Sequence, residues 1–320
     1  MSKATKIGLI TATILVVIGA IIFTGVITMF NFDFSKLDTN NYETNTYNIT
    51  EAFDNISIDV SVSEIKFLPA DTEQCKIVCY EPAKQKHSAT VQNSTLNISV
   101  NDTRKWYEHI SISVASPKLT VYLPQDKYTS LTINNTTGSV TIPQNFTFDD
   151  MKIKGSTGNF DCLASCSNLI DINLSTGRIK LNNLKANNMT IACTTGSVNI
   201  NSVNADGDIR IKTSTGAIKL SDINCANLTA KCTTGSTVLS NTIASENFAI
   251  NSTTGSVKFE SCDAENINIK TTTGSVSGTL RSDKIFITET TTGSVKVPKT
   301  TTGGICEVKT TTGSVKLDIQ

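Results

Sequence analysis

Catalytic and charged side chains are sparse in this sequence, and their scarcity argues against several classes of function. Basic and acidic residues number 28 each, so no net charge draws the chain to nucleic acid or to an anionic surface. There are two histidines and four arginines, and no phosphate loop, dinucleotide fingerprint, serine-hydrolase elbow or zinc-protease motif occurs. We therefore expect a protein that is not an enzyme, that uses no cofactor or metal, and that binds no nucleic acid.

Aromatic residues and proline are also few. The 320 residues include 19 aromatic residues and six prolines, so a core must be built mainly from aliphatic side chains. Thr, Ser and Asn are abundant after Asn134, and β-branched residues mixed with turn formers favour strands over helices. Both histidines, His87 and His109, precede this region, and we expect them to be solvated.

The N-terminus predicts a membrane anchor. Lys3 and Lys6 lie in the first six residues, and residues 7–29 then contain no charge. About 20 apolar residues are enough for a helix that spans a bilayer, and no Ala-x-Ala-like cleavage site follows. The preceding lysines predict a cytoplasmic tail and an extracellular C-terminal domain. We expect a single-pass protein of the cell membrane; a cleaved signal peptide is the alternative.

The nine cysteines are an odd number, so they cannot all pair within the chain. No Cys-x-x-Cys motif occurs among them. Cys75 and Cys79, like Cys162 and Cys166, are four residues apart, which is too far along a strand for a disulfide. We expect the cysteines to act as small apolar residues in or near the core.

A Thr-Gly motif recurs from Asn134 to the end of the sequence. Thr precedes each of its eleven glycines, and Thr or Ser stands one residue earlier. The first nine glycines are 19 or 20 residues apart, and the last two intervals are 10. We expect these glycines to form turns, because glycine adopts the positive φ that a tight corner requires. They are Gly138, Gly158, Gly177, Gly196, Gly216, Gly235, Gly255, Gly274, Gly293, Gly303 and Gly313.

Apolar and polar residues alternate on both sides of each glycine. Around Gly177, for example, Ile170, Ile172, Ile179 and Leu181 alternate with polar residues. This pattern predicts a strand on each side of a corner, and one such unit cannot bury its apolar face alone. We therefore predict an all-β fold, a repetitive β-solenoid of about nine coils of 19–20 residues. A β-sandwich or a meander of short hairpins is the alternative.

The sequence pattern divides the chain into five parts. These are a cytoplasmic tail (1–6), the membrane span (7–29), an Asn-rich linker (30–48), an N-terminal β cap (49–130) that includes a strand at 110–114, and the solenoid (131–320). The apolar phase slips by one residue at 284–287 and the period halves after Gly293. We expect a different closing structure there, such as hairpins that cap the open edge.

The repeats resemble a known family. Residues 119–124, residues 131–133 and the Thr137-Gly138-Ser139-Val140 motif with its iterations are similar to the bacterial putative-adhesin domain family, over residues 53–320. The resemblance implies a domain of unknown function, common in envelope proteins of Gram-positive bacteria. The family name implies adhesion, and some similar proteins are thought to act in envelope-stress signalling. The resemblance defines no functional residues in this chain.

Lysine recurs beside the Thr-Gly motif. We predict a polymer-binding stripe from the lysines four residues before the glycines, which are Lys154, Lys212, Lys231, Lys270, Lys299 and Lys309. Other lysines, such as Lys180 and Lys258, stand three residues after the glycines. The expected ligands are cell-wall polymers or host glycans. The alternative is a solvated face that discourages strand aggregation.

Two functions follow from these expectations. The first is a membrane-anchored, adhesin-like rod at the cell surface that contacts envelope or external polymers. The second is a sensor or regulator of envelope stress that acts with membrane signalling proteins.

Overall fold

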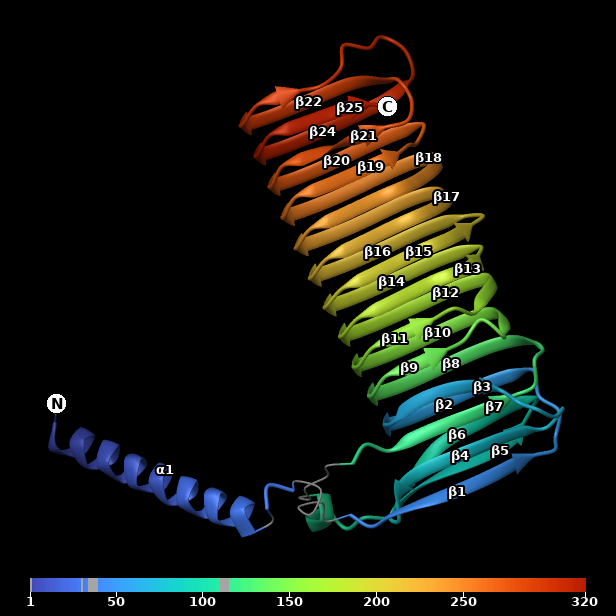
Figure 1. Cartoon of the computed structure of the whole chain (residues 1–320), viewed down its shortest axis with the longest axis vertical. Coiled ribbons are helices and arrows are strands. Elements are labelled where there is room, and N and C mark those ends of the chain that lie inside the picture. Colours follow the sequence, from blue (N-terminus) through green and yellow to red (C-terminus); the bar gives the residue numbers. More distant parts are fainter. Residues whose placement is uncertain (1, 30, 34–39, 110–114) are drawn as a thin grey trace.

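The computed structural model describes residues 2–29, 31–33, 40–109 and 115–320. It consists of one N-terminal helix followed by an elongated β domain (Figure 1). The helix, α1 (Lys3–Met29), is long and apolar enough to cross a membrane, a test that a signal sequence also passes. Four of its five threonines donate to carbonyls of the preceding turn, as Thr11 Oγ1 does to Ile7 O at 3.0 Å. The hydroxyls are therefore satisfied within the helix, as an apolar surrounding requires.

A cap of mixed strands precedes the rod (Figure 1). In this cap β1 pairs antiparallel with β4, β4 with β7, and β5 with β6. The elements are β1 (Tyr42–Ile49), β4 (Cys75–Pro82), β5 (Gln85–Gln92), β6 (Thr95–Asp102), η2 (Trp106–His109) and β7 (Lys118–Leu123). Since β1 begins at Tyr42, the expected linker over 30–48 is wrong at its C-terminal end: this polar segment is an edge strand held by β4. The strand expected at 110–114 lies outside the described residues.

The rod is a parallel β-solenoid, as the repeat predicts. Its first coil, β2 (Asn55–Val62) and β3 (Glu64–Pro69), lies between the cap and the first Thr-Gly repeat. One face consists of β8 (Lys127–Thr137), β10 (Thr147–Thr157), β12 (Ser165–Thr176), β14 (Asn188–Thr195), β16 (Asp208–Thr215) and β20 (Asn266–Thr273). The next face consists of β9 (Val140–Ile142), β11 (Phe160–Cys162), β13 (Ile179–Ala186), β15 (Val198–Ala205), β19 (Val257–Cys262) and β21 (Val276–Leu280). Two long strands, β17 (Ile218–Thr234) and β18 (Thr237–Thr254), run through both kinds of face.

Ten of the eleven glycines form one column, the glycine column, along an edge of the rod. The amides of nine of them donate to the neighbouring layer, as Gly158 N does to Thr176 O at 3.0 Å. A Cβ built on Gly216, at φ 140°, would lie 1.7 Å from Gly196 O. Both the positive φ and the close backbone contact therefore require glycine. The column contains every predicted turn glycine except Gly303, which stacks on Asp283.

The interior consists of stacked columns of aliphatic side chains. Ile153, Ile172, Ile191 and Ile211 occupy one such column, and all four are buried. A second corner lies six residues after the glycine, where Asn183, Ser202, Asp222, Asn241 and Ser261 have φ of 46–54°. All nine cysteines are buried and free, as expected. Cys225, for example, stacks on Ala244 in a column of small residues.

The far end of the rod does not follow the order of the chain. The coil made by β24 (Gly304–Thr312) and β25 (Val315–Ile319) pairs with β20 and β21 below it. The coil made by β22 (Lys284–Thr292) and β23 (Val295–Lys296) lies above it. Residues 304–319 are thus inserted between two layers that precede them in sequence. The expected closing hairpins are wrong, because all four of these pairings are parallel.

Candidate functional site

The exposed edge beside the glycine column carries two columns of hydroxyl groups, which together with the glycines we name the Thr-Gly ridge. The residue before each column glycine is threonine, and the strand registers place these ten threonines in line. All ten are exposed, because the corner turns both residues before the glycine outward. In spatial order they are Thr137, Thr157, Thr176, Thr195, Thr215, Thr234, Thr254, Thr273, Thr312 and Thr292.

Five of the six lysines of the predicted stripe lie in one column beside this ridge. The registers stack Lys212 on Lys231 and Lys270 on Lys309, with Asn251 between these pairs. Lys154 belongs to the same column nearer the cap. Lys299 does not, because it lies in the connection between β23 and β24, outside the strand ladder. The geometry of the stripe therefore holds for Lys154, Lys212, Lys231, Lys270 and Lys309.

A second lysine column follows the other flank of the ridge. From β13 to β25 this column alternates between lysine and other residues. Lys180, Lys219, Lys258 and Lys316 therefore occupy every second layer. Asn199, Val238 and Ser277 occupy the layers between them. Two layers of a parallel sheet are roughly 9.6 Å apart. These four lysines therefore present cations at regular intervals on the flank opposite to the stripe.

Basic and acidic side chains are unevenly distributed around the rod, and basic ones predominate at this edge. Within four residues of the ten column glycines there are eleven basic and two acidic side chains, although the whole chain is neutral. The acidic pair is Asp161 and Glu289. The basic set is Lys154, Arg178, Lys180, Lys212, Lys219, Lys231, Lys258, Lys270, Lys296, Lys309 and Lys316. The Thr-Gly ridge is thus the basic edge of the rod, and the acidic residues lie away from it.

Most lysines of the stripe are available to bind an anion. Among the described residues, Lys154, Lys212, Lys231 and Lys270 make no ion pair with any carboxylate. Lys309 differs, since its Nζ lies 3.0 Å from Glu307 Oε1 and 3.9 Å from Glu289 Oε2. The hydrogen bond with Glu307 raises the pKa of Lys309 and lowers the pKa of Glu307. The stripe is therefore neutralised at its far end and unpaired along its length.

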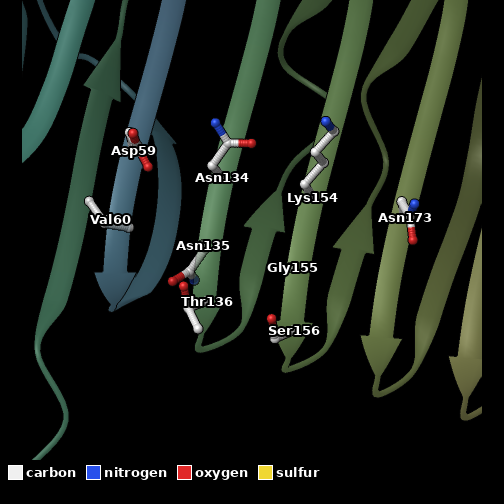
Figure 2. A pocket seen from close by; sticks show the side chains of 9 residues that line it. All are labelled: Asp59, Val60, Asn134, Asn135, Thr136, Lys154, Gly155, Ser156 and Asn173. Carbon is white, nitrogen blue, oxygen red and sulfur yellow. The ribbon is translucent and has the colours of Figure 1, made fainter.

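A shallow hollow of about 340 Å³ lies on the stripe next to the cap. Figure 2 shows Asp59, Asn134, Lys154 and Asn173 in a row across four neighbouring strands, in register with one another. Gly155 and Ser156 line the hollow between Lys154 and the ridge. Amides, hydroxyls, the Asp59 carboxylate and one cation thus meet on a surface that can hydrogen-bond to a hydroxylated ligand.

A buried polar cluster at the junction of cap and rod escaped the sequence analysis. His87 is buried, contrary to the expectation of a solvated histidine. One ring nitrogen, Nδ1, bonds to Glu81 Oε2, and the other, Nε2, lies 3.3 Å from Ser63 Oγ. Asn45 Nδ2 donates to Glu81 Oε1 at 2.7 Å, and the His87 amide donates to Oε2 at 2.6 Å. A lone histidine on a polar strand gives no signal for this arrangement.

The cluster has the residue types of a catalytic triad and of a metal site. Cys79 joins it, and the ligand atoms of Cys79, Glu81 and His87 lie within 4.8 Å of one another. Ser63, however, is fully buried, so no substrate reaches its hydroxyl. The Glu81 carboxylate already accepts bonds from Asn45 and His87, as a satisfied buried network requires. The arrangement supports a structural role in joining the first coil to the cap.

Solved structures of several bacterial proteins are similar to this chain. A putative adhesin from Parabacteroides distasonis is 11% identical, with a TM-score of 0.51, over 88% of this chain and 98% of that one. A putative adhesin from Bacteroides fragilis is 13% identical, with a TM-score of 0.46, over 88% and 99%. A putative lipid binding protein from Parabacteroides distasonis is 15% identical, with a TM-score of 0.49, over 75% and 98%. No curated protein matches the chain.

The family model named Toastrack DUF4097 matches residues 53–211 and 204–320, so it covers the whole rod and most of the cap. This agrees with the resemblance of the repeats to putative adhesins. The chain is a member of the Toastrack DUF4097 family.

Proposed function

We propose that this protein is a membrane-anchored rod of the cell surface that binds linear anionic polymers along its Thr-Gly ridge. The observation that carries the proposal is the sorting of charge, with eleven basic and two acidic side chains beside the glycine column of a neutral chain. A solvated face needs no such sorting. The ligands that fit are cell-wall polymers or host glycans with repeated anionic groups.

The ridge suits an extended ligand rather than a small one. Lysines flank it on both sides, and exposed threonines lie between them in every layer from β8 to β22. Each lysine contributes little by itself, because an exposed ion pair is worth about 0–1 kcal/mol. Many such contacts along one polymer add up, and salt weakens them. The binding is therefore expected to be multivalent and to depend strongly on ionic strength.

The experiment measures sedimentation of the full chain, in detergent micelles, with purified polyol-phosphate cell-wall polymer. Changing Lys154, Lys212, Lys231, Lys270 and Lys309 to Gln should weaken binding at least about tenfold, since the variant removes five cations of the ridge. The matched control changes five lysines of the cap, Lys76, Lys84, Lys86, Lys105 and Lys118, to Gln and should bind as before. Equal binding by both variants would refute the proposal. Lys299→Gln, which lies outside the column, should have no effect.

Regulation of envelope stress through membrane partners is the second function that the sequence suggests. The expected outcome of a pull-down from membranes under our proposal is cell-wall polymer without a specific membrane protein. A specific membrane-protein partner, retained by the five-lysine variant, would favour the signalling function instead.

A further inference from the structure

The cap exposes two aromatic side chains on η2, its short turn of helix. Trp106 is 81% exposed and Tyr107 is 50% exposed, and their ring centroids lie 5.9 Å apart in an edge-to-face arrangement. Trp106 is the most exposed large apolar side chain in the described part of the β domain, and it is the only tryptophan of the chain. Neither ring belongs to the hydrophobic core, so the pair is available to a partner outside the chain.

Hydrogen bonds and ion pairs fix this turn on the cap. Arg104 Nε donates to Asp102 Oδ1 at 2.9 Å, and Arg104 Nη2 donates to Asp102 Oδ2 at 2.6 Å. Glu108 accepts from the Lys105 amide at 3.0 Å and pairs with Lys84, in the connection between β4 and β5. Both carboxylates of the turn are thus paired with cations. The turn holds its aromatic rings outward in one geometry, so little conformational entropy is lost when they bind.

The same end of the cap receives the chain from α1. Ala83 N donates to Asn41 O at 2.8 Å, directly before β1 begins, and Thr103 N donates to Lys84 O at 2.9 Å. The connection between β4 and β5 therefore bonds on one side to the entering chain and on the other to the segment that leads into η2. In Figure 1 η2 is the short green helix at the end of the cap from which the chain leads back to α1.

A short connection keeps this end of the cap near a bilayer. Since α1 ends at Met29 and β1 begins at Tyr42, only residues 30–41 join them. A segment of that length reaches roughly 40 Å when fully extended. The membrane that holds α1 is therefore a large surface that η2 can reach at all times, at a high effective concentration.

We propose that η2 docks on the interface of the bilayer that α1 spans. Trp and Tyr are enriched at membrane interfaces, where the ring enters the apolar layer and its N–H or O–H stays hydrated. Lys105 places an exposed cation beside the rings: its Nζ lies 5.9 Å from the Tyr107 ring centroid, and it makes no ion pair among the described residues. Lipid phosphates are the anions at that depth, so rings and cation match the apolar and charged layers of the interface. Docking requires the membrane anchoring of the proposed function but not polymer binding.

The single tryptophan reports this contact directly. The full chain is reconstituted into vesicles of phosphatidylcholine and phosphatidylglycerol, and the fluorescence of Trp106 is measured. Bromine on the lipid chains should quench the emission at least about twofold, because an interfacial ring reaches the upper part of those chains. The quenching should persist in high salt, which weakens polyanion binding along the ridge.

A matched control moves the tryptophan to the far end of the rod. The variant Trp106→Phe combined with Ile287→Trp keeps an aromatic ring on η2 and places the fluorophore at a position that is 50% exposed. Its emission should respond to iodide in solution and not to brominated lipid.

Flotation of the vesicles separates docking from anchoring. A chain that floats with the vesicles, while Trp106 responds to iodide and not to brominated lipid, would refute docking and leave anchoring intact. A chain that does not float would refute anchoring, and docking with it. Quenching of Trp106 by a soluble cell-wall glycan, without any response to lipid, would overturn the proposal in favour of sugar stacking.

Protease protection gives a second measurement that does not use fluorescence. In vesicles, trypsin should cleave the native chain after Lys105 at least about tenfold more slowly than the variant Trp106→Ser with Tyr107→Ser, because docking covers this bond. Both chains should float equally well. Equal unfolding midpoints show that the variant is folded, and equal rates of cleavage would contradict docking.

Discussion

Single residues in this rod are constrained by what lies directly above and below them. The glycine column shows this most clearly, because a Cβ on any member would meet a backbone carbonyl of the adjacent layer. A side chain there collides with backbone, which cannot move without shifting the layers on both sides. The repeat therefore tolerates Ser, Asn, Arg or Ala one residue later and only glycine at the corner itself.

Gly216→Ala should be one of the most damaging small substitutions in the chain. The new Cβ would lie 1.7 Å from Gly196 O at a backbone φ of 140°. We expect the free energy of unfolding to fall by about 3 kcal/mol or more, since strain at a positive φ adds to the steric clash. Urea denaturation measures the change. The control Ala217→Ser, which introduces the residue that most other coils have there, should stay within about 0.5 kcal/mol.

The buried thiols should make the fold sensitive to alkali. Burial raises the pKa of Cys225, like those of Cys75, Cys79, Cys162 and Cys306, from 9.0 to about 12. Above pH 9 the unfolded chain loses these protons while the folded chain keeps them. The free energy of unfolding therefore falls as pH rises from 9 to 12, by about 1.4 kcal/mol per pH unit for each thiol.

Cys225→Ala isolates one of these groups, because the adjacent layer already has Ala244 at that position. The variant should lose stability less steeply than the native chain above pH 9, as measured by urea denaturation between pH 8 and 11. A constant difference between the two chains across this range would show that Cys225 does not titrate as its burial requires.

At the scale of the strand and the coil, the sequence indicates the strands and the corner of each layer but not the order in which the layers stack. Alternation and the Thr-Gly spacing were enough to predict the strands, the corner and the outward lysines. The position of residues 304–319 was not predictable, because every layer carries the same motif and the pattern does not indicate which layers are neighbours. Gly303 and Lys299 therefore fit the repeat in sequence and lie outside its columns in space. His87 could not be placed either, since its side-chain partners, Ser63 and Glu81, come from separate segments of the chain.

Deleting residues 304–320 should disorder more than the deleted coil. These residues separate β20 and β21 from β22 and β23, which would lose their neighbouring strands. We expect amide hydrogen exchange in residues 284–296 to become as fast as in an unfolded chain, while layers near the cap stay protected. Deleting Gln320 alone is the control, and it should leave exchange in residues 284–296 unchanged. Persistent protection of these residues in the shorter chain would contradict the inserted order.

At the scale of the whole molecule, the fate of the N-terminal helix decides whether the rod stays attached to a membrane. We expect α1 to be retained, because residues 7–29 are uncharged and offer no good cleavage site. The mature protein should then contain residues 1–29 by intact mass and resist extraction from membranes at alkaline pH. Changing Leu15 and Ile18 to Lys, in the middle of α1, should release it into the soluble fraction. A mature N-terminus beyond residue 29 would show instead that the helix is a signal sequence.

The inserted coil has a consequence for the order of assembly. During synthesis residues 284–296 emerge before residues 304–319, although they lie one layer higher. Layers near the cap can fold in the order in which they are synthesised. Residues 284–296 therefore remain exposed to solvent until residues 304–319 fold into the layer below them. Completion of the rod is therefore a single late event, and until it occurs the growing end presents unpaired backbone to its surroundings.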